Sequence, residues 1–126
     1  LFLSLHNGLE LCYSFFIFCC KKDCLFKTNK SITMGEIILK AKNIFKSYVN
    51  GEKTLPVLND LSIQVEKNQI ITITGQSGSG KSTLLNILGS LDKPDDGEVV
   101  IDGLNILDLN NYEIAKIRNQ KIGFVF

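Results

Sequence analysis

Apolar and polar residues follow a regular pattern from residue 36 onward, and the first part of that pattern has the period of β-strands. Residues 37–49 form a mixed apolar run that ends at Asn50-Gly51, a dipeptide that favours a tight hairpin turn. Residues 61–66 then alternate strictly between apolar and polar side chains, as in a strand with one solvated face. This part of the chain therefore predicts antiparallel strands.

The period changes over the next segments. Residues 70–74 are β-branched without interruption, which suits a strand covered on both faces in a parallel sheet. Leucine and isoleucine then recur at helical spacing over residues 81–91, and Pro94 and Gly97 close that segment with a turn. Further along we expect short strands over residues 98–103 and 104–107, a helix over 111–118 and a strand over 122–126.

Composition limits the class of protein. The 126 residues are enough for one domain, and 44% of them are hydrophobic while 21% are charged. The formal net charge is +1, so neither disorder nor a strongly basic nucleic-acid-binding surface is expected. The chain is predicted to be a globular domain without a nucleic-acid partner.

The character of the sequence changes near residue 33. All four cysteines and the only histidine lie within residues 1–33, and the only methionine, Met34, directly precedes the patterned stretch. We interpret residues 1–33 as upstream-translated or foreign sequence outside the fold. The apolar run over residues 11–20 is shorter than the roughly 20 residues that cross a bilayer, and its positive charge follows it, unlike a secretory signal. The cysteine spacing matches neither a zinc site nor a disulfide framework.

A glycine-rich motif lies between the predicted buried strand and the predicted helix. It fits G-x-x-x-x-G-K-[ST] at every position and reads Gly75, Gln76, Ser77, Gly78, Ser79, Gly80, Lys81 and Ser82. Glycines let successive backbone N–H groups converge on a polyphosphate, and the start of the helix favours an anion. We expect Lys81 to reach the β- and γ-phosphates, Ser82 to ligate Mg²⁺ and Thr83 to donate to the α-phosphate. A simple Gly/Ser-rich linker is the alternative, but the flanking strand and helix favour a phosphate site.

With this motif, the runs 88–94 and 118–126 resemble the ATP-binding subunit of ABC transporters over residues 36–126, in particular its lipoprotein-releasing and macrolide-export branch. The resemblance implies an α/β P-loop NTPase fold. Residues 34–126 would be the N-terminal part of an ABC-type nucleotide-binding domain, with an antiparallel β subdomain and the start of the parallel core sheet. It further implies ATP and Mg²⁺ as ligands, with Tyr48 stacked on the adenine and Val57 beside the base.

The resemblance also implies a setting for the whole protein. ATP binding by such a subunit powers export or lipoprotein release through transmembrane permease subunits, at the cytoplasmic face of the inner or plasma membrane. A second ATP-binding subunit, in a homodimer, completes the site.

Several family features lie outside this sequence. The resemblance implies a glutamine, an LSGGQ signature, a catalytic glutamate and a histidine after the last strand, and the chain ends before the expected glutamine. We therefore expect no catalytic residue in it, no ATP turnover and poor folding by this chain alone, and we interpret the carboxylates Asp95, Asp96, Asp102 and Asp108 as solvated. A non-hydrolysing regulatory nucleotide-binding module is the alternative function, and a small-molecule P-loop kinase is a third.

Overall fold

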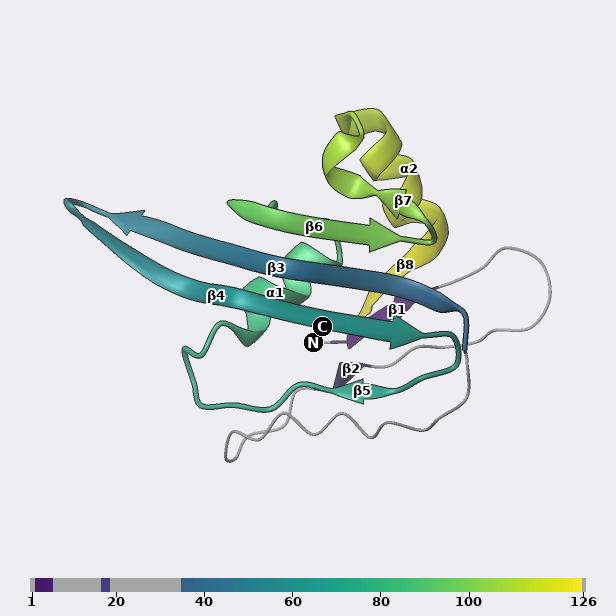
Figure 1. The fold of residues 1–126 in the computed structure, drawn as a ribbon, viewed down its shortest axis with the longest axis horizontal. Coiled ribbons are helices and arrows are strands. Elements are labelled where there is room, and N and C mark those ends of the chain that lie inside the picture. The colour runs from purple at the N-terminus through teal and green to yellow at the C-terminus, as the bar shows by residue number, and fades with distance from the viewer. Residues whose placement is uncertain (1, 6–16, 19–34, 126) are drawn as a thin grey trace.

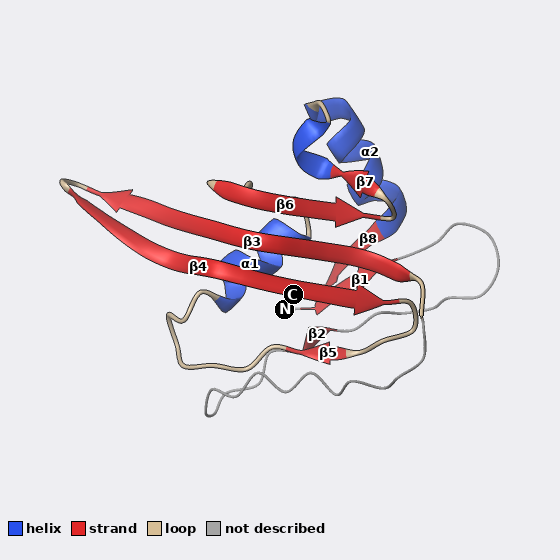
Figure 2. Ribbon diagram, viewed as in Figure 1, coloured by secondary structure: helices blue, strands red, loops and turns tan. Residues whose placement is uncertain are grey.

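A computed structural model describes residues 2–5, 17–18 and 35–125 of the chain (Figure 1). Its elements are β1 (Phe2–Leu5), β2 (Ile17–Phe18), β3 (Ile37–Asn50), β4 (Lys53–Glu66), β5 (Ile71–Thr72), α1 (Lys81–Leu88), β6 (Asp96–Ile101), β7 (Leu104–Asn105), the 3₁₀ turn η1 (Ile106–Asp108), α2 (Asn111–Lys121) and β8 (Ile122–Val125). Figure 2 shows the long strands extended side by side, with α1 behind them. No helix among the described residues has both the length and the apolar character needed to cross a membrane.

The long hairpin of β3 and β4 confirms the predicted antiparallel strands. Asn50 pairs with Lys53, so the two turn residues are Gly51 and Glu52, one position later than the predicted dipeptide. Gly51 has φ 65°, a backbone conformation that glycine adopts without a steric penalty. β3 also pairs with β6 along its other edge, and β7 follows, which gives an antiparallel sheet in the order β4-β3-β6-β7.

The core lies between this sheet and α1. Along β4, Ile63 and Val65 are buried while Ser62 and Gln64 are exposed, so the predicted period of two is confirmed. The buried residues of α1 join the same apolar cluster as those of β3, β4 and β6; they are Leu84, Leu85, Ile87 and Leu88. Four buried side chains in an eight-residue helix mean that packing, rather than helix propensity, holds α1 in place.

The helix ends earlier than its apolar pattern predicts. α1 stops at Leu88, Gly89 follows as its C-cap, and Ser90 has φ 58°, which turns the chain away from the helix axis. Leu91, which we expected on the buried face of the helix, is therefore 48% exposed. The predicted helix end at residue 91 was wrong because Gly89 and Ser90 end the helix at Leu88.

The strand expected over residues 70–74 is shorter than predicted, and it is not covered on both faces in this chain. Only Ile71 and Thr72 form the strand β5, and they pair in parallel with β2. Ile73 is buried, but Ile70 is 65% exposed and Thr72 is exposed as well. Within the described residues β5 has one paired edge and one covered face, so its β-branched run has a solvated side.

The last third of the chain follows the predicted order of elements, with two shifts. The strand expected over residues 104–107 is only β7, because the Asn105 side chain accepts a hydrogen bond from the Leu107 N–H and starts the 3₁₀ turn η1 instead. α2 runs on to Lys121, beyond the expected end at residue 118. Its start is fixed by a capping box, in which Asn110 and Glu113 each accept a hydrogen bond from the other's backbone N–H.

Two short pieces of residues 1–33, the segment we interpreted as lying outside the fold, have paired strands. β1 pairs antiparallel with β8, from Phe2 opposite Val125 to Leu5 opposite Ile122, and β2 pairs with β5. β5 lies in the segment expected to belong to a parallel sheet, and both β5 and β8 have their described partners within residues 1–33. The four cysteines, the histidine and Met34 lie outside the described residues, and the origin of the segment stays a prediction.

Candidate functional site

The glycine-rich loop connects β5 to α1, as its motif predicts. Gly78 and Gly80 have φ 81° and 84°, a region that side-chain-bearing residues rarely adopt, which explains glycine at both positions. The side chains of Gln76, Ser77 and Ser79 are exposed. The loop therefore presents its backbone to solvent directly ahead of the helix.

Lys81, the first residue of α1, bends back over this loop. Its Nζ donates to the carbonyl oxygen of Gly75 at 2.8 Å, to that of Gln76, and to Ser79 Oγ at 3.3 Å. The ammonium group is thus held inside the curve of the loop by neutral oxygens. Within the described residues no ion pair is made by Lys81, so its positive charge is available to an anion.

The N-terminus of α1 suits an anion for a second reason. Gly80 is the N-cap and has no side chain to accept from the first-turn N–H groups, and the first turn contains no acidic residue. Uncapped N–H groups and the helix dipole together favour negative charge at this end. Ser82 is exposed and Thr83 is half-buried in the same turn. A polyphosphate therefore fits the residues present.

Val57 of β4 lies directly against the glycine-rich loop at Gly80. A Cβ atom at Gly80 would lie 2.9 Å from the Val57 carbonyl oxygen and 3.0 Å from Val57 Cγ1, so only glycine allows this approach. Val57 is half-buried and packs against the core. This close approach joins the hairpin to the glycine-rich loop just ahead of α1.

Tyr48 lies on β3 near the hairpin turn and is 42% exposed. Its cross-strand partner is Leu55, which is 62% exposed. β4 has an irregularity just beyond this pair, where Val57 lies between the pairs Lys46–Leu58 and Ser47–Pro56 without a partner of its own. Tyr48 and Leu55 therefore lie toward the turn end of the hairpin, two residues along β4 from Val57, the residue that packs against the glycine-rich loop.

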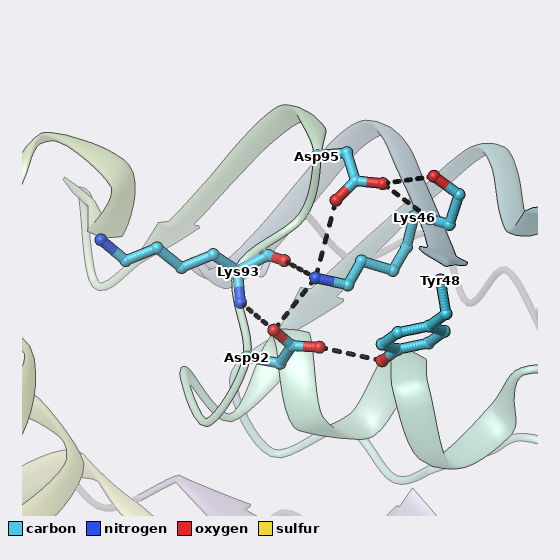
Figure 3. A network of polar contacts seen from close by, with 6 residues as sticks. Lys46, Tyr48, Asp92, Lys93 and Asp95 are labelled. Carbon is cyan, nitrogen blue, oxygen red and sulfur yellow. Dashed lines mark hydrogen bonds and ion pairs between the residues drawn. The ribbon is translucent and has the colours of Figure 1, made fainter. Parts of the chain in front are cut away.

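Tyr48 belongs to a polar network centred on Lys46 (Figure 3). We call it the Lys46 network; its members are Lys46, Ser47, Tyr48, Asp92, Asp95 and the Lys93 carbonyl. Lys46 Nζ lies 3.0 Å from Asp92 Oδ1, 2.6 Å from the Lys93 carbonyl oxygen and 3.6 Å from Asp95 Oδ1. The Tyr48 hydroxyl donates to Asp92 Oδ2 at 2.9 Å. The network ties β3 to the turn between α1 and β6.

The charges of the network stabilise one another. Burial alone would lower the pKa of Lys46, but its hydrogen bond to Asp92 and the nearby negative charges raise it. Burial alone would raise the pKa of Asp92, but hydrogen bonds from Lys46 and Tyr48 lower it. Hydrogen bonds from the hydroxyl and N–H of Ser47 lower the pKa of Asp95. All three groups therefore stay charged at neutral pH.

The Asp92 carboxylate should make a contribution to the free energy of unfolding that depends on pH. A carboxylate whose pKa is lower in the folded state stabilises the fold above its unfolded pKa, and that contribution is lost as the pH falls through the folded pKa, below about pH 4. Asp92→Asn should cost about 0.2–1 kcal/mol at pH 7, a small effect because the pair is partly solvated, and less at pH 3. Urea unfolding at both pH values measures it; an equal loss at both would contradict the charged pairing.

Neither Lys46 nor Asp92 was a candidate in the sequence analysis. They are 46 residues apart in the sequence. The antiparallel pairing of β3 with β6 brings the turn that carries Asp92 close to Lys46 on β3. The four carboxylates interpreted as solvated, Asp95, Asp96, Asp102 and Asp108, are all exposed. Asp102 nevertheless pairs with Lys121 at 2.7 Å, and Asp95 belongs to the Lys46 network.

No cluster of three or more histidine, cysteine, aspartate or glutamate side chains that could hold a metal ion occurs in the described part of the chain. This is consistent with Mg²⁺, which proteins often bind through one or two side chains plus substrate phosphates. The Ser82 hydroxyl, in the first turn of α1, is the predicted protein ligand.

Comparison with known proteins gives one consistent result. The family profile described as ABC transporter matches residues 58–126. The ABC transporter ATP-binding protein MJ0796 of Methanocaldococcus jannaschii is 47% identical over 89 residues, 71% of this chain and 38% of its own. The lipoprotein-releasing system ATP-binding protein LolD of Buchnera aphidicola is 47% identical over 92 residues, 73% of this chain and 40% of its own. The macrolide export ATP-binding/permease protein MacB of Vibrio parahaemolyticus is 38% identical over 93 residues, 74% of this chain and 14% of its own.

Solved structures agree with the sequence relatives. The dimeric structure of the MJ0796 cassette superposes with a TM-score of 0.68 at 48% identity, covering 70% of this chain and 38% of that one. A dimeric post-hydrolysis state of MJ0796 bound to ADP and Pi gives 0.61 at 45% identity, covering 64% and 34%. The chain thus spans about two fifths of the length of the ATP-binding subunits and cassette that it matches.

Proposed function

The chain belongs to the ABC transporter family as an N-terminal portion of its ATP-binding domain, and from that premise we propose that residues 75–83 bind the phosphates of ATP together with Mg²⁺. The observation that carries the proposal is the position of the Lys81 ammonium inside the curve of the glycine-rich loop, at an uncapped helix start. Loop N–H groups and Lys81 would hold the β- and γ-phosphates, Ser82 the Mg²⁺ ion, and Thr83 the α-phosphate.

The base of the nucleotide would stack on Tyr48. A flat aromatic ring binds a purine through its π-face without reading much of the base edge. The exposed ring of Tyr48 lies opposite Leu55, from which β4 leads to Val57 and the loop. Val57 would therefore lie between the base and the phosphates, a position consistent with its contact to Gly80.

Tyr48 substitutions test the base contact. Tyr48→Ala should weaken ATP binding by about 1–3 kcal/mol, because the stacking surface is lost, whereas Tyr48→Phe and Tyr48→Trp should have smaller effects than Tyr48→Ala because a π-face remains. Titration with a fluorescent ATP analogue measures all three. If Phe were as damaging as Ala, the hydroxyl rather than the ring would be the functional group.

The family supports a proposal for the function of the whole protein. We propose that ATP binding and hydrolysis by the complete protein power export or lipoprotein release through transmembrane permease subunits, at the cytoplasmic face of the inner or plasma membrane. LolD and MacB, named for lipoprotein release and macrolide export, support this branch. The dimeric MJ0796 structures support a second ATP-binding subunit as partner.

One experiment tests the central proposal. The protein is titrated with ATP, with and without Mg²⁺, and with GTP and inorganic tripolyphosphate for comparison. We expect tighter ATP binding with Mg²⁺ than without it, and measurable but weaker binding of tripolyphosphate, which lacks the base. Failure to bind any of these phosphates would refute the site; binding without hydrolysis by the complete protein would favour the regulatory module.

A further inference from the structure

The Tyr48 side chain is restrained from two directions by groups that the glycine-rich loop does not supply. Its hydroxyl donates to Asp92 Oδ2 at 2.9 Å, which fixes the direction in which the ring points. Lys46 Nζ lies 5.4 Å from the ring centroid, on one face of the ring, within the range of a cation–π contact. Two separate contacts thus restrain the direction of the ring and place a positive charge over one of its faces.

The restraining groups are themselves firmly held. Only 12% of the Lys46 side chain is exposed, and its ammonium lies between Asp92, Asp95 and the Lys93 carbonyl. Asp92 also accepts a hydrogen bond from the Lys93 N–H at 2.8 Å, and Asp95 accepts two from Ser47, at 2.7 and 2.8 Å. Figure 3 shows these groups meeting at the Lys46 ammonium, with the Tyr48 ring beside them.

We propose that Lys46 and Asp92 are positioning residues for base recognition: they hold the Tyr48 ring in its stacking orientation and leave the face opposite Lys46 for the base. The inference rests on the proposed function, in which Tyr48 stacks on the base. A ring that is already ordered loses less side-chain entropy when a ligand binds, so removing its restraints weakens binding although no direct ligand contact is lost.

The network also joins the base end of the site to the end of α1. Asp92 lies four residues beyond the last residue of α1, the helix whose first residue, Lys81, faces the phosphates. α1 is rigidly packed, with four of its eight residues buried in the core. The Lys46 network therefore fixes the Tyr48 ring relative to the same helix that carries the phosphate-binding lysine.

The test compares ATP with inorganic tripolyphosphate, which lacks the base. Asp92→Asn and Lys46→Met, measured with Mg²⁺ present, should each weaken ATP binding about two- to tenfold and leave tripolyphosphate binding unchanged. Lys46→Arg, which keeps the positive charge, should restore most of the ATP affinity. Lys67→Met is the matched control, because it removes an exposed lysine paired with Glu36 at 3.2 Å, outside the network.

A merely structural role gives a different result. If the network only supported the fold, its loss would weaken ATP and tripolyphosphate equally, and the same effect would persist in a Tyr48→Ala background. We expect instead that Asp92→Asn has no further effect on ATP binding once Tyr48 is alanine. Equal losses for both ligands, or an undiminished effect in that background, would overturn the inference.

The outcomes also separate this inference from the proposed function. If Tyr48→Ala weakens ATP binding while Asp92→Asn and Lys46→Met do not, the ring stacks without help and only the positioning inference is refuted. If Tyr48→Ala leaves ATP affinity unchanged, base stacking and positioning both fail, while phosphate binding at Lys81 still stands. If the wild-type protein binds neither ATP nor tripolyphosphate, the phosphate site itself is refuted.

Discussion

Lys81→Ala is expected to weaken ATP binding by about 1.5–3 kcal/mol, or roughly 10- to 150-fold. Hydrogen bonds from an ammonium group to phosphate are charge-assisted and are among the stronger kinds in proteins. The Lys81 ammonium also bridges the carbonyl oxygens of Gly75 and Gln76, so its removal takes away contacts that shape the loop. Titration with a fluorescent ATP analogue measures the loss.

Two controls distinguish the role of Lys81 from a general effect of charge. Lys116→Ala removes an exposed lysine of α2 and changes the net charge equally, so its ATP affinity should match that of the wild type. A thermal melt of each variant shows whether the fold is retained. If Lys81→Ala bound ATP as tightly as Lys116→Ala, Lys81 would not be a phosphate ligand.

Gly97→Ala is expected to destabilise the fold by about 2–4 kcal/mol, more than an average substitution. Gly97 has φ 110°, and a Cβ atom there would meet the Asn43 carbonyl oxygen at 2.4 Å and that of Lys42 at 2.8 Å. β3 has an irregularity between Lys42 and Phe45 where it pairs with β6, and Asn43 has φ 50°. The bulged backbone of β3 thus occupies the space that a side chain at residue 97 would need.

Gly103→Ala is the matched control for that substitution. Gly103 has φ 79°, but no atom lies within 4 Å of a Cβ built on it, so alanine there meets backbone strain without a clash. We expect a loss of about 1–2 kcal/mol at Gly103 and a clearly larger one at Gly97, from urea unfolding of both variants. Equal losses would show that the close approach of β3 to Gly97 has no energetic consequence.

Features that depend on neighbours in the sequence were the ones that could be predicted. The glycine-rich loop, the hairpin and the start of α1 each have a local signature: a spaced glycine motif, a turn dipeptide and a helical apolar period. Tyr48 and Val57 came from family resemblance, and no local pattern of residues distinguishes either from an ordinary strand residue. The structure places Val57 against Gly80 and leaves Tyr48 exposed beside Leu55.

Features that depend on distant parts of the chain were missed. The Lys46 network needs the pairing of β3 with β6, which joins residues 51 to 62 positions apart and has no signature in either segment. Residues 70–74 are not buried on both faces for a related reason: a β-branched run shows that a strand can be buried, but its neighbours decide whether it is. In the described structure only one edge of β5 is paired.

The uncapped start of α1 also has a thermodynamic consequence. Gly80 provides no side-chain acceptor for the first-turn N–H groups, and a bound phosphate would supply the missing acceptors. A ligand that binds only the folded state stabilises it by mass action, by about 2.7 kcal/mol at a concentration 100 times its dissociation constant. If the proposed site binds ATP, the order of this helix turn, and with it the melting temperature, is linked to the nucleotide concentration around the protein.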